Sequence, residues 1–164
     1  MNPLAATVKV RPLTLADLDR VIEIEQNITG APHWPPSAYL AALGSQAAPL
    51  RIALAVEAPS DGSSSPDRRG LAGFAVASLL PPQAELETIA VAAEFQRRGL
   101  AGRLFASLAA ELRAAHVIEV FLEVRASNQP ALGFYRQVGF VDTGRLRSYY
   151  HDPVEDAVLM RLQL

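Results

Sequence analysis

One helix set between two strands constrains the fold of this 164-residue chain more than any other feature. From Leu100 to Leu112 leucines recur at every fourth position, with small or aromatic apolar residues beside them, which is typical of a helix that buries one face. The preceding run, 85–91, ends in β-branched residues that favour a strand, and the apolar run 117–124 follows the helix. The centre of the chain is therefore predicted to be a strand, a helix and another strand.

Capping residues place three more helices. Thr14 is expected to cap the first, supported by Asp17 in its first turn, and Ser37 is expected to cap a short second one. A third begins at Ser127 or Asn128 and carries a proline in its first turn. Each of these segments presents apolar residues at helical spacing, so each is expected to pack on the core.

Alternation and apolar runs predict the remaining strands. A hairpin with a long surface tip at 58–70 is expected in the first half of the chain, and a tyrosine-bearing loop is expected before the last strand. The order of elements predicts an α/β (α+β) fold, with a mixed central sheet of about six to seven strands and helices on both faces. The predicted strands beyond the central two are 8–12, 51–57, 71–80, 140–143 and 156–162.

Composition and charge exclude several classes of function. Half of the residues are apolar and one fifth are charged, and the length fits one domain over residues 1–164. The net charge of -2 provides no basic surface for nucleic acid, and no apolar run reaches the length of a membrane span. No leader segment is recognised, so the cytoplasm is the expected location. Three scattered histidines and the absence of cysteine predict no metal site.

A glycine-containing turn joins the central strand to its helix. The first N–H groups of a helix have no intrahelical partner and carry the positive end of the dipole, so a diphosphate can accept several of them. Gly99 and Gly102 let phosphate oxygens approach the main chain, and Arg97, Arg98 and Arg103 add positive charge. Taken alone, glycines before a helix more often do no more than make a turn.

Residues 96–101, QRRGLA, resemble the Q/R-x-x-G-x-G/A motif with which acetyltransferases of the GNAT superfamily hold coenzyme A. The resemblance extends over nearly the whole chain and is most specific between LETIAV, which begins at residue 86, and YYHD, which begins at residue 149. It implies the GNAT fold, with two central parallel strands that splay apart, and acetyl-coenzyme A as co-substrate. The residues implied to bind it are Ile89, Val91, Ala92, Gln96, Arg97, Arg98, Gly99, Leu100, Ala101, Gly102, Arg103, Asn128 and Tyr135.

The segment FLEVRASN, residues 121–128, is similar to the signature of the branch that acetylates ribosomal alanine. The resemblance implies that Glu123 is the general base and that Tyr135, twelve residues later, is the general acid that protonates the thiolate. Attack on a thioester needs an unprotonated amine, and the departing thiolate benefits from receiving a proton. A base and an acid are therefore both expected. In isolation, Glu123 would be the polar face of a strand and Tyr135 a core residue. Glu87 is a further candidate carboxylate, or an exposed strand residue.

The acceptor side of the predicted site is expected to hold a protein N-terminus. Tyr149 and Tyr150 resemble the paired tyrosines that line the peptide groove of N-terminal acetyltransferases, and aromatic rings with a hydroxyl can pack a small side chain while bonding a peptide. Trp34 lies in a loop where related enzymes carry Phe-Pro-Trp, although its neighbours differ here. The acceptor-side candidates are Trp34, Glu87, Tyr149 and Tyr150.

Alternatives remain open at this point. The same scaffold also acetylates lysine or small amines, and a non-catalytic domain that senses acetyl-coenzyme A is a rival from another class, since fold alone does not determine function. Asp152, Glu155 and Asp156 either attract the basic start of a ribosomal protein or form a solvated acidic face. The chain is expected to be a monomer or a weak homodimer.

Overall fold

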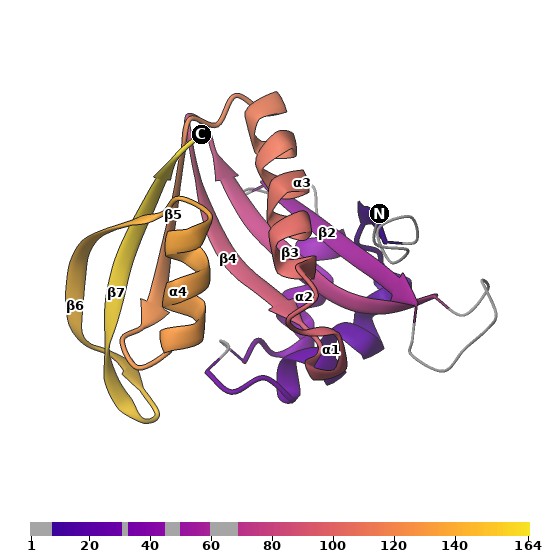
Figure 1. Cartoon of the computed structure of the whole chain (residues 1–164), viewed down its shortest axis with the longest axis horizontal. Coiled ribbons are helices and arrows are strands. Elements are labelled where there is room, and N and C mark those ends of the chain that lie inside the picture. The colour runs from indigo at the N-terminus through magenta and orange to yellow at the C-terminus, as the bar shows by residue number, and fades with distance from the viewer. Residues whose placement is uncertain (1–7, 31–32, 45–49, 60–68) are drawn as a thin grey trace.

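A seven-stranded mixed sheet in the order β1-β2-β3-β4-β5-β7-β6 forms the centre of the protein (Figure 1). The structure is a computed structural model that describes residues 8–30, 33–44, 50–59 and 69–164. The strands are β1 (Lys9–Pro12), β2 (Leu50–Pro59), β3 (Arg69–Leu80), β4 (Gln83–Val91), β5 (Glu119–Arg125), β6 (Val141–His151) and β7 (Val154–Gln163). The helices are α1 (Leu18–Gln26), α2 (Pro36–Gly44), α3 (Leu100–Ala114) and α4 (Gln129–Gln137), with short 3-10 turns η2 (Leu15–Asp17) and η3 (Ala93–Phe95).

Helices cover both faces of the sheet, as the order of elements predicts. Figure 1 shows α3 and α4 in front of the sheet and α1 and α2 behind it. The predicted apolar face of α3 is buried, with Leu104, Leu108 and Leu112 fully enclosed. On the other face, the ring of Tyr39 from α2 packs edge-on against Phe74 of β3, with ring centres 6.0 Å apart. Within the described residues, no helix has the length and apolar character needed to cross a membrane.

The parallel strands β4 and β5 separate partway along their length. They pair only from Gln83↔Glu119 to Glu85↔Phe121, although β4 continues to Val91 and β5 continues to Arg125. Beyond Glu85 the facing edges of both strands are therefore not paired with each other. This confirms the expected splayed strand pair at the centre of the sheet, directly before the glycine-containing turn.

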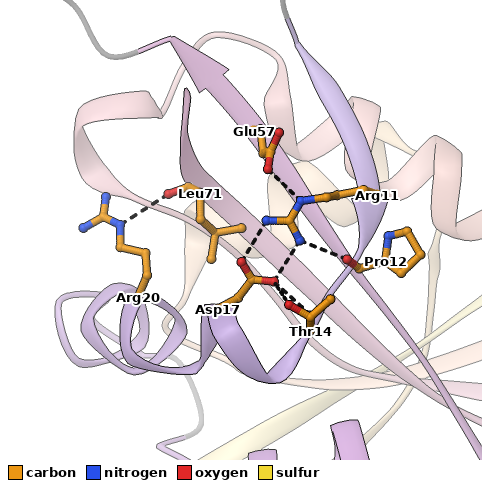
Figure 2. Close-up of polar contacts among 7 residues, drawn as sticks. All are labelled: Arg11, Pro12, Thr14, Asp17, Arg20, Glu57 and Leu71. Atoms are coloured by element: carbon orange, nitrogen blue, oxygen red, sulfur yellow. Dashed lines mark hydrogen bonds and ion pairs between the residues drawn. The ribbon is translucent and has the colours of Figure 1, made fainter. Parts of the chain in front are cut away.

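The start of α1 is fixed by an arginine on β1, as Figure 2 shows. Arg11 donates from two nitrogens to the carboxylate of Asp17, both at 2.8 Å, and from Nε to Glu57 of β2 at 2.6 Å. Asp17 also accepts the backbone N–H of Thr14 at 2.9 Å, which satisfies a donor at the helix N-terminus. The predicted cap is therefore present, but it opens a 3-10 turn, and α1 proper begins at Leu18.

Two sequence expectations about the elements are wrong. The tyrosine-bearing loop is a strand, because β6 runs without interruption from Val141 to His151 against β7. Nearly all residues of β6 are exposed, so the strand lacks the alternation of apolar and polar residues that marks a half-buried strand. Ser37 is not the cap of α2, since that helix already includes Pro36. Residues 60–68 of the expected hairpin tip lie outside the described residues.

Candidate functional site

The turn between β4 and α3 has the backbone of an anion site. Arg97 and Gly99 both adopt left-handed conformations, with φ of 61° and 75°, and Gly99 is the residue that precedes the first turn of α3. The N–H groups of that turn have no partner within the helix. A Cβ placed on Gly99 or on Gly102 would meet no atom within 4 Å, so open space lies in front of the main chain. The chain therefore fits a diphosphate at this position.

Side chains of the turn brace its shape. The amide of Gln96 donates to the carbonyl of Val91 at 2.9 Å and ties the turn to the end of β4. Arg98 donates to the carbonyl of Glu94 at 2.8 Å, and its guanidinium lies over the ring of Phe95, 5.4 Å from the centre. Gln96 and Arg98 thus bond to the main chain of neighbouring segments, and Gln96, Arg97 and Arg98 are all exposed at the turn.

Helix α1 also supports the turn, through contacts of Arg20. Arg20 forms an ion pair with Glu94, which belongs to η3 immediately before the turn. The same guanidinium donates to the carbonyl of Leu71 on β3 at 3.3 Å, a contact drawn in Figure 2. Arg20 therefore links helix α1, strand β3 and the segment that precedes the turn.

A cleft of about 510 Å³ opens between the separated strands. It is bounded by residues from β4, β5, α4 and the loop 27–30 that follows α1. Of the predicted site residues, it is lined by Ile89, Val91, Gln96, Ala101, Asn128, Tyr135, Glu87, Glu123 and Tyr150. The other predicted residues lie outside this lining: Ala92, Arg97, Arg98, Gly99, Leu100, Gly102, Arg103, Trp34 and Tyr149.

Two of those outlying residues have contacts that differ from the expected ones. The backbone N–H of Ala92 donates to Ala72 on β3 at 2.8 Å, and its carbonyl accepts from Phe95 at 2.8 Å, so Ala92 closes the end of β4 instead of offering a free edge. The side chain of Leu100 is buried in the core, leaving only its backbone toward the turn. The unpaired edge available to a ligand therefore ends at Val91.

Tyr135 enters the cleft from α4 within an aromatic cluster. Its ring lies 5.6 Å from that of Phe134 and 5.7 Å from that of Phe140. Burial, with a smaller contribution from Tyr150, raises the pKa of Tyr135 to about 12. The N-terminus of the same helix is capped by Asn128, whose side chain accepts the N–H of Ala131 at 3.3 Å.

Three glutamates share one face of the separated strands. Residues alternate in direction along a strand, so Glu85 and Glu87 of β4 point to the same side as Glu123 of β5. Arg51 of β2 pairs with Glu87 through two hydrogen bonds, at 2.8 and 3.2 Å. Partial burial and the negative charges of Glu123 and Glu87 raise the pKa of Glu85.

Glu85 and Arg51 were missed by the sequence reasoning. Glu85 lies two positions before Glu87 on the same strand, and this spacing predicts that both side chains share one face. The sequence was therefore sufficient to identify Glu85 as a candidate. Arg51 lies thirty-six positions before its partner, and only the sheet order brings the two together.

Two neighbouring tyrosines of β6 lie at the acceptor side, where Tyr150 lines the cleft and Tyr149 packs against Tyr150. The rings of Tyr149 and Tyr150 are 5.1 Å apart and nearly perpendicular. The guanidinium of Arg125 lies 4.2 Å from the centre of the Tyr150 ring. The negative charge of Glu123, followed by burial, raises the pKa of Tyr149. Burial, followed by the charge of Tyr149, raises the pKa of Tyr150 to about 12.

Trp34 is placed next to the core and not in the lining of the cleft. Its ring packs against Tyr39, with ring centres 5.2 Å apart. The backbone N–H of Trp34 donates at 2.7 Å to Glu25, a buried carboxylate of α1. The loop that does line the cleft is 27–30, at the end of α1, where Gly30 lies close against Asn128. Sequence reasoning missed this loop because its residues carry no recognisable motif.

Comparisons with known proteins agree with this geometry. The acetyltransferase (GNAT) family profile matches residues 21–140. The [ribosomal protein bS18]-alanine N-acetyltransferase of Salmonella typhimurium is 32% identical over 93% of this chain and 95% of its own length. N-alpha-acetyltransferase RimI of Mycobacterium tuberculosis is 37% identical over 94% and 91%. The crystal structure of the ribosomal-protein-S18-alanine N-acetyltransferase from Escherichia coli superposes with a TM-score of 0.76 at 30% identity, covering 95% of this chain and 93% of that one.

Fold, turn and sequence relationship lead to one assignment. The splayed strands and the glycine-containing turn are in the positions that the motif implies, and the relatives align over almost their full length. The chain belongs to the GNAT family and is an acetyl-coenzyme A dependent N-acetyltransferase.

Proposed function

We propose that this protein transfers the acetyl group of acetyl-coenzyme A to the α-amine of a protein N-terminus, and that the acceptor is the N-terminal alanine of a small-subunit ribosomal protein. One observation carries the proposal: the cleft between β4 and β5 is lined by Tyr135, Glu123 and Tyr150 together. Two relatives that align over most of the chain support the acceptor, since their names specify bS18-alanine and α-amine acetylation.

On the donor side, the backbone of the turn would hold the diphosphate of acetyl-coenzyme A. The first N–H groups of α3 have no partner within the helix, and a Cβ at Gly102 would enter open space. Arg97 would add positive charge next to them. The unpaired edge of β4 from Leu86 to Val91 would then bond the amides of the pantetheine arm, and so direct the thioester into the cleft.

On the acceptor side, Glu123 would accept the proton of the incoming amine, directly or through a water molecule. The negative charge of Glu123 contributes to the raised pKa of Glu85, so the two carboxylates interact within the same site. An α-amine has a pKa of about 7.7 to 8.0, whereas lysine has one of about 10.4 and is almost wholly protonated at neutral pH. A base of this kind is therefore sufficient for an N-terminus.

Tyr135 would stabilise the departing thiolate. Its pKa of about 12 keeps the phenol protonated at every physiological pH, so the donor is always present. A thiol has a pKa of about 8.5, so complete proton transfer from this phenol is uphill. We infer that Tyr135 acts mainly by hydrogen bonding to the sulfur, with Asn128 at the start of α4 holding the helix that carries it.

The test compares acceptors under identical conditions. Purified protein is supplied with acetyl-coenzyme A and with an alanine-starting ribosomal peptide, the same peptide blocked at its N-terminus, a lysine peptide with a blocked N-terminus, and a polyamine. Thiol release and mass spectrometry should show acetylation of the free alanine peptide only. Reaction of the lysine peptide or the polyamine alone would contradict the acceptor, and cofactor binding without any turnover would favour a sensor.

Three further expectations belong to this proposal, and they concern the location, the number of domains and the oligomeric state. A ribosomal acceptor would place the protein in the cytoplasm, and a 164-residue chain of one domain would act as a monomer or a weak homodimer. Sedimentation of the purified protein at several concentrations tests the oligomeric state. A mass-spectrometric survey of N-termini in cells lacking the protein tests the acceptor, and fractionation of wild-type cells tests the location.

A further inference from the structure

The two acceptor-side tyrosines do not follow the geometry of a regular strand. Neighbouring residues of a strand point to opposite faces, yet the rings of Tyr149 and Tyr150 are in contact at 5.1 Å. The register between β6 and β7 shifts between Leu146 and Tyr150, and Ser148 within this bulge has a φ of 48°. The left-handed conformation is unfavourable for serine, and a bulge commonly redirects a side chain.

One carboxylate of β7 stabilises the bulge. Asp156 accepts the backbone N–H of Ser148 at 2.9 Å, and its other oxygen lies 3.8 Å from the guanidinium of Arg145. The backbone carbonyl of Asp156 accepts the N–H of Ala126 at 3.0 Å, in the loop that follows β5. Asp156 therefore connects the tyrosine bulge to the segment that leads from Glu123 to α4.

We propose that Asp156 is a positioning residue for the acceptor: it holds Ser148 in the left-handed conformation and so turns Tyr149 and Tyr150 together toward the acceptor. This inference rests on the proposed function of the two tyrosines. It replaces the interpretation of Asp156 as part of a solvated acidic face, because the side chain is only 34% exposed and its oxygens are engaged by Ser148 and Arg145.

The kinetic test uses Asp156→Ala, with Asp142→Ala as the matched control. Asp142 is also a carboxylate of β6–β7, and its partner is Arg136 on the surface. Loss of a hydrogen bond to a charged group should raise the KM for the alanine peptide about tenfold in Asp156→Ala. The KM for acetyl-coenzyme A should stay within about twofold of wild type, since the bulge is on the acceptor side. The control should change neither constant.

Rescue separates positioning from a general loss of stability. Asn in Asp156→Asn retains an oxygen acceptor for the N–H of Ser148, so this variant should keep most of the wild-type peptide KM. Glycine adopts the left-handed region without strain, so Ser148→Gly added to Asp156→Ala should lower the raised KM again. Failure of both variants to restore the peptide KM would overturn the inference.

A structural readout distinguishes this inference from the proposed function. Amide exchange of Ser148 and the ring-to-ring nuclear Overhauser effect between Tyr149 and Tyr150 are measured by NMR in wild type and Asp156→Ala. Faster exchange and a weaker ring contact are expected in the variant. If both are unchanged, Asp156 does not hold the bulge, whatever peptide the wild type acetylates. Absence of alanine-peptide acetylation by wild type, with the NMR changes present, would instead reject the proposed acceptor.

Discussion

The guanidinium of Arg51 reaches over β3 from β2 and binds both carboxylate oxygens of Glu87 on β4, at 2.8 and 3.2 Å. This pair neutralises one of the three glutamates on the acceptor face. Its positive charge also lowers the pKa of Glu85, against the larger effects of burial and of Glu123 that raise it. The arginine therefore sets how much negative charge the incoming amine meets.

Arg51→Met should shift the pH dependence of catalysis. Removing the positive charge raises the pKa of Glu85 further, so Glu85 remains protonated to a higher pH. A protonated carboxyl cannot accept a proton from the amine, so the rising limb of kcat, which reports the bound complex, should move to higher pH. The measurement is a pH profile for the alanine peptide. Arg136→Met, on the surface at α4, should leave the limb in place, and an unmoved limb in Arg51→Met would contradict the argument.

Tyr135→Phe should lower kcat while leaving acetyl-coenzyme A bound. Removing a positioned proton donor typically costs about a hundredfold or more, and the ring itself is retained in its aromatic cluster. Because the pKa of Tyr135 is raised to about 12, the phenol stays protonated as pH rises to about 10, so wild-type kcat should show no alkaline fall due to this group. Thiol release measures both the kcat of the variant and the pH dependence of kcat in wild type. Tyr39→Phe, a buried tyrosine outside the cleft, is the control, and equal losses in the two variants would point to folding instead of chemistry.

The donor side could be predicted from sequence because its physics is local. The turn, its glycines and the N-terminus of α3 are consecutive in the chain, so a motif of six residues defines them. The same holds for Asn128, which caps the helix it begins. These elements lie where the sequence analysis predicts them, and the three arginines of the turn are exposed.

The acceptor side could be predicted only in part, because strand order assembles it. Arg51 meets Glu87 through the pairing β2-β3-β4, and no local pattern in either segment indicates the other. β6 was missed as a strand because it is exposed along nearly its whole length, so burial does not impose alternation on it. The contact between Tyr149 and Tyr150 depends on a bulge, which alternation alone would exclude.

Gly102→Ala should weaken acetyl-coenzyme A binding, and Gly133→Ala should not. Both glycines lie in helices, and at both a Cβ would meet no protein atom within 4 Å, so alanine should fit and favour each helix. Only at Gly102 does the added methyl enter the space in front of the turn, where it would keep phosphate from the N–H groups. Calorimetry with coenzyme A should show a Kd raised about tenfold for Gly102→Ala. Equal affinities for the two variants would place the diphosphate elsewhere.

Asp17→Asn should destabilise the fold in a pH-dependent way. The guanidinium of Arg11, followed by the N–H and hydroxyl of Thr14, lowers the pKa of Asp17 from 3.8 to about 2 in spite of its burial. A carboxyl with a lowered folded-state pKa stabilises the protein above its unfolded-state pKa, and this stability is lost as pH falls through the folded value. Wild type should therefore lose about 1–2 kcal/mol of unfolding free energy between about pH 5 and pH 2 through this group, and the variant should lack that loss.

Urea unfolding of wild type and Asp17→Asn at pH 7 and at pH 3 measures this difference. At pH 7 the variant should be less stable by about 1–2 kcal/mol, and the gap should narrow at pH 3, where the Asp17 carboxyl of the unfolded wild-type chain is mostly protonated. Asp142→Asn is the control: its ion pair with Arg136 is 46–50% exposed, so its removal should cost less than about 0.5 kcal/mol at either pH. A gap at Asp17 that stays constant with pH would mean that the helix start depends on side-chain shape and polarity and not on the charge that Arg11 binds.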